Sequence, residues 1–458
     1  MNPSNPNEND SVTLSLSARR RSLLWRIHFW GALIASPFAL MAVLTGILYI
    51  FTPQIEARLY DQLDHVAPEG ERRRLDDAVV AATVAAPSGW VLQSVIPAYH
   101  PGDTVRAAFA PDLHAQGGHS HGPTQVAPVA QTGFGLPAGA MVVYVDPYKA
   151  VVVGTLADAS RFNNWGKRLH SELLQSDGWR WMIELAASWL MVMLLTGIYL
   201  WWPQGAQRAL PQPGAKGRAA WKQWHSFIGV AFSVVSLTIL TTGLTWSKYS
   251  GDQVRRLRDG IGQAPPSVPK NLASAVSEGS APLTWQAAWD ATRRSAPDVS
   301  LQLTPPRGPQ GIWRATAASR NQPEKRFDLV LDAYSGQVLY AAGWDQQTVF
   351  SKATAIGIPF HRGEFGLWNQ VLLLTFGVGV LFSLASGWVM FFKRRPPGWR
   401  ILPRLLPGAW QSASIGEWIA AVILCIAMPL LALSAAFVLA LEVAIHRSGH
   451  SAAASNAS

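Results

Sequence analysis

The chain has 458 residues, of which 49% are hydrophobic and only 14% are charged. Soluble domains carry about a quarter charged residues, so this composition indicates that part of the chain lies in lipid. The 21 tryptophans agree, because Trp collects at membrane interfaces. The net charge of +10 does not indicate nucleic-acid binding, since no basic nucleic-acid motif is present and the basic residues cluster beside apolar segments.

The N-terminal segment, residues 1–22, is polar and then basic at Arg19, Arg20 and Arg21. It continues into a long apolar run without a cleavage site, which predicts a retained signal anchor. The single cysteine, Cys425, lies in another apolar run. One thiol excludes an intrachain disulfide and a cysteine-rich metal site, and no C-x-x-C-H motif for covalent haem attachment occurs.

Five apolar stretches are long enough to cross a membrane as helices, which takes about 20 residues. They are residues 23–51, 181–202 within a segment 165–202, 224–246, 365–392 within a segment 351–392, and 415–443. The loops 203–223 and 393–414 contain Lys and Arg but no acidic residue. The positive-inside rule therefore predicts that these loops and the N-terminus are cytoplasmic, and that residues 52–164, 247–350 and 444–458 are periplasmic.

The two long outer segments resemble each other. Each contains a helix-like stretch, residues 75–86 or 285–295, and ends with a strand, a turn and a second strand. The turns are Asp146-Pro147-Tyr148 and Asp332-Ala333-Tyr334, and Asp, Pro and Gly are typical of tight turns between β-branched strands. We expect two small periplasmic α+β modules, the first of which carries a histidine-containing insert.

The predicted fold is therefore an α-helical integral membrane protein with five transmembrane helices. A unit of span, module and span occurs twice, and the fifth span has no partner. Thr-Gly or Ser-Gly pairs recur in the first four spans, at Thr45-Gly46, Thr196-Gly197, Thr242-Gly243 and Ser386-Gly387.

Four histidines occupy matching places in this repeat. His28 and His225 lie near the cytoplasmic starts of spans one and three, and His170 and His361 lie at the outer approaches to spans two and four. Ligands of one group must share a membrane depth, and the seventeen residues from His28 to Thr45 cover about 26 Å of helix. We therefore expect His28 to pair with His225, and His170 with His361. Paired axial imidazoles on facing helices are typical of b-type haem that transfers electrons, so the sequence predicts two haems.

The surroundings of these histidines favour the same interpretation. A cationic side chain lies beside each one, and these are expected to pair with haem propionates: Arg26, Lys222, Arg168 and Arg362. Gly31 and Gly229 follow His28 and His225 on the same helix face and are expected to leave room for a flat ring. The Thr-Gly and Ser-Gly pairs are expected to make space at the depth of the other haem.

Two alternatives remain for the histidines. An interfacial histidine beside small-residue helix packing is common in membrane bundles, although four matching positions favour ligands. A non-haem metal has too few ligands, because two histidines at each depth do not complete a zinc site. Further histidines lie in polar stretches that either bind Cu or Zn or are insertions without a metal: His100, His114, His119, His121, His446 and His450.

The chain resembles the PepSY-associated transmembrane family of bacterial inner membranes over about residues 20–395. The motifs that carry the resemblance are Trp25-Arg26-Ile27-His28, Leu169-His170-Ser171-Glu172, Thr196-Gly197-Ile198-Tyr199 and Trp224-His225-Ser226. The two Asp-x-Tyr turns resemble those of PepSY domains. The fifth span, the insert near residues 114–121 and the C-terminal tail depart from the family pattern.

Members of that family include haem proteins that reduce the iron of ferric siderophores in the periplasm. The resemblance implies that this chain is a ferric-chelate reductase in iron uptake, with the four histidines as haem ligands. Nothing in the sequence binds NAD or flavin, so the electron donor is expected to be another molecule, either quinol or a cytoplasmic reductant. The alternative is a non-enzymatic, membrane-anchored PepSY module that binds or inhibits periplasmic partners. A metal permease is a weaker third, because the spans contain almost no carboxylates.

Overall fold

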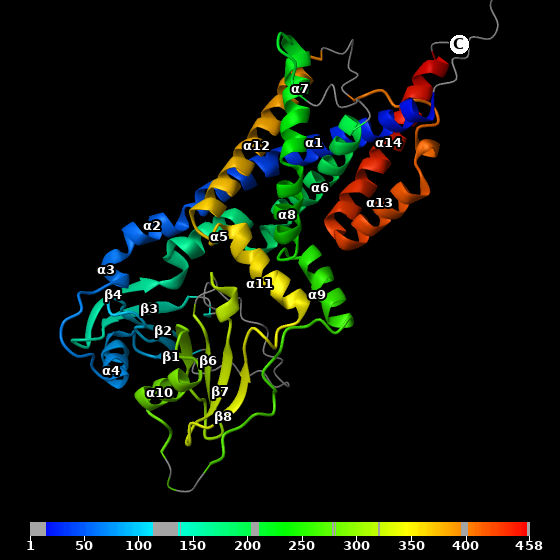
Figure 1. The fold of residues 1–458 in the computed structure, drawn as a ribbon. Helices are drawn as coiled ribbons and strands as arrows, with labels where there is room; N and C mark the ends of the chain where they lie inside the picture. Colours follow the sequence, from blue (N-terminus) through cyan, green and yellow to red (C-terminus); the bar gives the residue numbers. More distant parts are fainter. Residues whose placement is uncertain are drawn as a thin grey trace, which may run out of the picture. The chain divides into compact units, whose positions relative to one another are not determined.

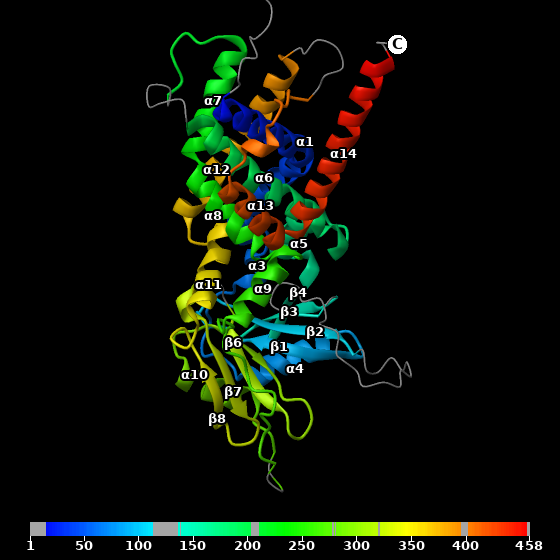
Figure 2. The ribbon, with the colours of Figure 1, turned by 90° about the vertical axis from the view of Figure 1, so that its right-hand side faces the viewer.

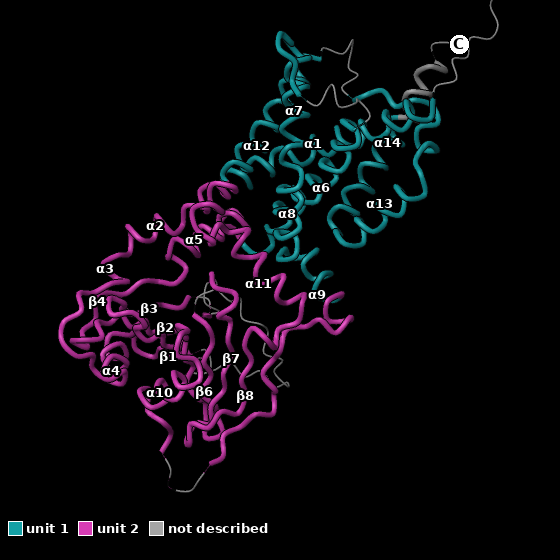
Figure 3. Tube along the Cα trace, viewed as in Figure 1, with its two compact units in different colours: residues 1–44, 176–256, 374–458 teal, residues 45–175, 257–373 magenta. Residues whose placement is uncertain are grey.

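The computed structural model describes residues 15–112, 136–137, 139–202, 210–276, 279, 281–318, 321–394 and 402–455. The chain divides into two compact units, coloured separately in Figure 3. The helical unit comprises Met1–Leu44, Ser176–Arg256 and Leu374–Ser458. The sheet unit comprises Thr45–Gln175 and Leu257–Leu373.

Within the described residues, three helical segments are long and apolar enough to cross a membrane (Figure 1). They are α1 (Leu16–Ile50), the segment Asp177–Trp201 that contains α6 (Trp181–Trp201), and α12 (Leu367–Phe392). They coincide with the first, second and fourth spans expected from the sequence. The chain is therefore a membrane protein with a β-sheet domain.

The third expected span, residues 224–246, is not one straight helix. The structure has α7 (Gly217–Ala231) and α8 (Ser233–Leu244), bent by 60° at Phe232, and together they pass the test for a span. The Ser233 hydroxyl donates to the carbonyl of Val230 at 2.8 Å, a side-chain contact that commonly bends helices. The ring of Phe232 packs where a side chain on Gly379 of α12 would lie, 3.2 Å from that Cβ position.

The fifth expected span, residues 415–443, is also broken. It consists of α13 (Ile415–Ala427) and α14 (Pro429–Ser455), and neither apolar part reaches the length of the other spans. Proline lacks a backbone N–H and clashes with the carbonyl four residues earlier, which ends α13 before Pro429. Met428, Leu431 and Val438 pack in a core with Trp30 of α1 and Trp189 of α6.

The sheet unit contains one eight-stranded antiparallel sheet (Figures 1 and 2). Its strand order is β4-β3-β2-β1-β5-β6-β7-β8. The strands are β1 (Trp90–Ile96), β2 (Val105–Pro111), β3 (Met141–Asp146), β4 (Val151–Ala157), β5 (Leu301–Thr304), β6 (Ile312–Ala317), β7 (Asp328–Asp332) and β8 (Val338–Ala342). The two expected α+β modules are thus halves of a single sheet, joined where Val95 of β1 pairs with Leu303 of β5.

The two halves are related by matching contacts between their helices. Helices α4 (Leu75–Ala85) and α10 (Trp285–Ser295) share one apolar core against the same face of the sheet. The Asp76 carboxylate accepts from the first backbone N–H of α10 at 2.8 Å, and the Gln286 side chain accepts from the first N–H of α4, also at 2.8 Å. Each helix therefore caps the other from its second residue, which satisfies N–H groups that a helix start leaves free.

The Asp-x-Tyr turns also match. Asp146 Oδ1 accepts from the backbone N–H of Tyr148 at 2.7 Å, and Asp332 Oδ1 accepts from that of Tyr334 at 3.0 Å. Both tyrosine hydroxyls then donate to a proline carbonyl at 2.8 Å. The internal repeat of the outer segments is therefore visible in three dimensions.

Two further helices of the sheet unit carry the remaining predicted histidines. His170 lies near the end of α5 (Phe162–Glu172), and His361 lies in the last turn of α11 (Val349–Arg362). Each helix ends in a left-handed residue, Leu173 with φ 50° and Gly363 with φ 76°, so that the chain turns before the next span. The unit also contains the short helices α2 (Thr52–Leu59) and α3 (Asp61–Asp64).

Candidate functional site

His28 of α1 and His225 of α7 lie together in the helical unit. Their ring centroids are 6.4 Å apart and their planes are inclined by 81°. A metal–imidazole bond is about 2.0 Å long, and the ring nitrogen lies about 1.1 Å from the ring centre, so the centres of two rings on opposite sides of one metal ion are about 6.2 Å apart. The separation of the two rings is therefore close to that of two imidazoles on one metal ion, and His28 and His225 are the pair that the spacing predicts.

Hydroxyl groups orient both rings. His28 Nδ1 lies 3.0 Å from Thr196 Oγ1, and His225 Nδ1 lies 2.8 Å from Ser386 Oγ. Each hydroxyl donates its own proton to a carbonyl of its helix, at 2.8 Å for Thr196 and 3.1 Å for Ser386. Each hydroxyl oxygen must therefore accept from Nδ1–H, which leaves the lone pair of Nε2 available to a metal.

The glycines near this pair have different roles. A Cβ on Gly197 would lie 3.3 Å from His28 Cε1, so this glycine makes room for the imidazole itself. A Cβ on Gly31 would lie 2.9 Å from the Met193 side chain. Gly31 therefore serves packing against α6 rather than space for a flat ring, contrary to the expectation from sequence. Gly229, by contrast, faces open space.

His170 has the same kind of surroundings in the sheet unit. Its Nδ1 lies 3.1 Å from Thr45 Oγ1, and a Cβ on Gly46 would lie 3.2 Å from its Cε1. Hydroxyl and glycine are neighbours in sequence, as Thr196 and Gly197 are. The Thr-Gly pairs thus hold a histidine by a hydrogen bond and by close contact, a function beyond the spacing role expected for them.

A polar network joins the helices that carry His170 and His361. Asn163 Oδ1 accepts from the Tyr49 hydroxyl at 2.7 Å and from Arg362 Nη2 at 2.8 Å. Tyr49 lies in the last turn of α1, Asn163 at the start of α5 and Arg362 at the end of α11. The network therefore connects α5, which carries His170, with α11, which carries His361, within the sheet unit. His170 and His361 are the predicted outer histidine pair.

Arg362 retains a free donor in this network. Its guanidinium lies 5.6 Å from the centroid of the Tyr49 ring and pairs with Glu364 at 2.9 Å. Its Nε is buried and has no hydrogen-bond partner among the described residues. A buried donor without a partner costs about 1–3 kcal/mol, and a carboxylate next to His361 would satisfy it.

The other predicted cations are placed differently. Arg26 forms a paired ion contact with Glu442 of α14, at 2.6 and 2.7 Å, and also donates to the carbonyl of Pro403. Arg168 pairs with Glu172 one turn along α5, at 3.0 Å. Both guanidinium groups thus pair with carboxylates of the chain itself, and not with haem propionates as expected from the sequence. Lys222 lies on α7, three residues before His225.

Other metal sites receive no support from the structure. Among the described residues, no three His, Cys, Asp or Glu side chains are grouped so that they could hold a metal ion. The predicted cluster of His114, His119 and His121 lies outside the described residues. His100 lies in a turn, where its backbone N–H donates to Asp103 at 2.7 Å.

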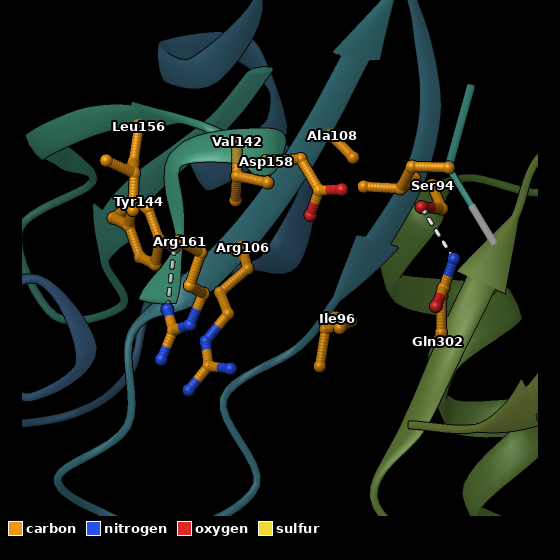
Figure 4. Close-up of a pocket in the computed structure, with 11 residues that line it drawn as sticks. Ser94, Ile96, Arg106, Ala108, Val142, Tyr144, Leu156, Asp158, Arg161 and Gln302 are labelled. Carbon is orange, nitrogen blue, oxygen red and sulfur yellow. Dashed lines mark hydrogen bonds between the residues drawn. The ribbon is translucent and has the colours of Figure 1, made fainter. Parts of the chain in front are cut away.

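A hollow lies on the face of the sheet opposite to α4 and α10 (Figure 4). The hollow opens to solvent and crosses the seam of the two halves, where Gln302 donates to Ser94 at 2.8 Å. On its other side Arg161 bonds Tyr144 at 2.9 Å and Asp64 at 2.6 Å. Burial raises the pKa of the Tyr144 hydroxyl, which therefore stays protonated and polar.

Three polar residues of these sites were missed in the sequence. Tyr49 lies four residues after Thr45, and Asn163 lies seven residues before His170, so helical spacing alone places each on the same face as its neighbour. Glu442 is the one carboxylate in the apolar run from residue 429 to 445, which marks it as a candidate for a buried partner.

The family comparison covers most of the chain. The model of the PepSY-associated TM region matches residues 25–394, which include all four histidines and both halves of the sheet. A search of curated proteins found no match. Because the family match extends over well more than half of the chain, this protein belongs to the PepSY-associated TM family.

Proposed function

We propose that this protein is a di-haem b electron conduit of the bacterial inner membrane that reduces a ferric chelate in the periplasm. One electron from quinol or a cytoplasmic reductant converts Fe³⁺ of the chelate to Fe²⁺, which hard oxygen ligands hold less tightly. The two haems would supply the one-electron carriers. The observation that carries the proposal is the facing pair His28 and His225, 6.4 Å apart, with both Nδ1 atoms bonded to hydroxyls.

Side chains of this protein orient the histidine rings and would bind the haem. Thr196, Ser386 and Thr45 fix ring directions, so that the imidazole nitrogens are already aimed before a metal arrives. This arrangement lowers the cost of ordering the ligands. Tyr49 and Asn163 position Arg362, whose unpartnered Nε suits a propionate of the outer group.

The hollow of the sheet unit is the docking point that we assign to the chelate. Arg161 precedes the first residue of α5, and His170 lies nine residues further along that helix, a rise of about 14 Å. Arg106, Ser94 and Gln302 offer hydrogen-bond donors at the hollow to an oxygen-rich ligand. The basic loops 203–223 and 393–414 support an orientation with this unit in the periplasm.

The test is a reduced-minus-oxidised visible spectrum of the protein purified in detergent after expression with ample haem. We expect b-type bands and two haems per chain. His28→Ala should halve the haem content, and the pair His170→Ala with His361→Ala should remove the other half. His65→Ala is the matched control, because this exposed histidine pairs only with Asp61, at 3.0 Å, in the hydrogen bonds described.

A colourless protein whose four histidines tolerate alanine would overturn the proposal. The membrane-anchored binding module would then be the better interpretation. Reduction of a ferric chelate by the dithionite-reduced protein, followed as reoxidation of its bands, tests the second half of the claim.

A further inference from the structure

Three arginines of the helical unit lie on or directly after the helices that carry or hold His28 and His225, which we call the inner histidine pair. Arg26 lies two residues before His28 on α1, and Arg218 lies seven residues, about two turns, before His225 on α7. Arg394 follows the end of α12, the helix whose Ser386 holds His225. Burial lowers the pKa of Arg394, and the positive charges of Arg218 and Arg26 lower it further, so both of these arginines lie close enough to Arg394 to repel it.

Among the described residues, little negative charge pairs with this cluster. Glu442 forms a two-bond ion pair with Arg26, in which both side chains are largely buried. No ion pair of Arg218 or Arg394 occurs among the described residues. The adjoining loops 203–223 and 393–414 contain no Asp or Glu at all.

Arg394 also has an unfilled donor. Its Nη1 is buried and has no hydrogen-bond partner in the described part of the chain. A guanidinium donor that is buried beside two like charges is destabilising unless an anion with oxygen acceptors lies next to it. A carboxylate or phosphate of a bound molecule has the oxygen acceptors that this donor needs.

We propose that Arg218 and Arg394 form the anion site that anchors the propionates of the inner haem, the haem that His28 and His225 would hold. This inference rests on the proposed function and replaces the assignment of that role to Arg26 and Lys222. Arg26 is instead held by its ion pair with Glu442. A phospholipid phosphate at the membrane edge has the same chemistry and is the competing source of the anion.

The experiment compares Arg394→Gln, the double variant Arg218→Gln with Arg394→Gln, and Arg394→Lys. Lys393→Gln is the matched control, because Lys393 is the exposed neighbour of Arg394. Haem per chain, the midpoint potential of each haem and co-purifying phosphorus are measured in detergent. In the double variant we expect haem to fall from two toward one per chain, with the bands of the outer haem kept. Arg394→Lys should retain more inner haem than Arg394→Gln.

Retention of the outer haem shows that a variant has folded, so loss of the inner haem is then specific. Two haems with unchanged potentials in the double variant would overturn the inference, as would loss of bound phosphorus without any change in haem. Equal loss of both haems from a variant that still elutes like the parent would also count against an inner site. Absence of haem from the parent protein would overturn both the proposed function and this inference. The other outcomes bear on this inference alone.

Discussion

At the scale of single residues, the Thr-Gly pair recurs as a clamp on histidine. Thr196 with Gly197 holds His28, and Thr45 with Gly46 holds His170. The hydroxyl fixes the rotation of the ring, and the missing side chain lets the helix backbone come close to it. Ser386 provides the hydroxyl for His225.

Under the proposed function, we expect Thr196→Val to weaken haem binding at His28 and His225 by about 10- to 100-fold, because residues that orient a ligand typically contribute that much to metal affinity. The measurement is the rate of haem transfer to an excess of a haem-scavenging protein. Thr238→Val is the control, since that hydroxyl is exposed and donates to the carbonyl of Val234 in its own helix at 2.9 Å. Equal rates for the two variants would contradict the clamp.

The residues of the candidate site were predictable to different degrees. The four histidines stand out because they repeat with the spans, and each hydroxyl-glycine pair stands out because it lies seventeen to twenty-six residues after a histidine. Which hydroxyl meets which ring depends on how α1 packs on α6, and that packing has no local signal. The pairing of Arg26 with Glu442 joins residues 416 positions apart and is invisible for the same reason.

At the scale of elements, apolar composition predicted where helices lie better than where they break. The helix break at Pro429 can be predicted from the sequence, because proline cannot continue a helix. The 60° bend at Phe232 could not be predicted from the sequence, since the run from 224 to 246 has no proline and no charged residue and the bend depends on Ser233 and on packing against Gly379.

Helix α14 is fastened to α1 by a buried ion pair. We expect Glu442→Gln to destabilise the protein by about 3–5 kcal/mol, because it leaves the Arg26 charge buried without its partner. Thermal unfolding in detergent measures the effect. Glu417→Gln should cost under about 1 kcal/mol, because its contact with Arg20 is 3.5 Å long and both side chains are about a third exposed. Similar unfolding temperatures for the two variants would show that α14 is not held in this way.

The turn between β7 and β8 should make the sheet sensitive to acid. Burial acts to raise the pKa of Asp332, but hydrogen bonds from the backbone N–H groups of Ser335, Ala275 and Tyr334 outweigh it and hold this pKa below its usual value. A lowered pKa in the folded state stabilises the fold above the ordinary aspartate value of about 3.9. That stability is lost as the pH falls through the folded value.

Asp332→Asn should therefore be less stable than the parent near neutral pH and should lose less stability on acidification to about pH 3. Limited proteolysis of the sheet unit across this pH range measures both. Asp298→Asn, at an exposed position, should follow the parent protein. A parallel pH dependence of Asp332→Asn and the parent would contradict the role given to this carboxylate.

At the scale of the whole molecule, the two halves of the repeat share one sheet. The strands β3, β4, β7 and β8, the helices 75–86 and 285–295 and both turns were predictable from local patterns. The strands β1, β2, β5 and β6 were not predicted. The joining of β1 to β5 was not, because strand pairing across some two hundred residues leaves no mark in a single sequence.

This seam should make the halves unfold together. Leu303 is fully buried and pairs with Val95 across the seam. We expect Leu303→Ala to cost about 2–5 kcal/mol and to lower the protease resistance of both halves equally. Val338→Ala, on the exposed outer strand β8, should have little effect. Loss of resistance confined to residues 281–342 would show that the halves are independent.

The hydroxyl groups that bond His28 and His225 have a consequence for how electron transfer couples to the membrane potential. Thr196 and Ser386 keep their protons at every physiological pH, so under the proposed function His28 and His225 would hold the haem iron through its Fe³⁺/Fe²⁺ change without taking up or releasing H⁺. Transfer toward the periplasm then moves bare negative charge out of the electrically negative side of the bilayer. Each electron that crosses the membrane in this direction releases about 2.3 kcal/mol of free energy per 100 mV of membrane potential. The membrane potential, rather than a proton gradient, would then drive iron release.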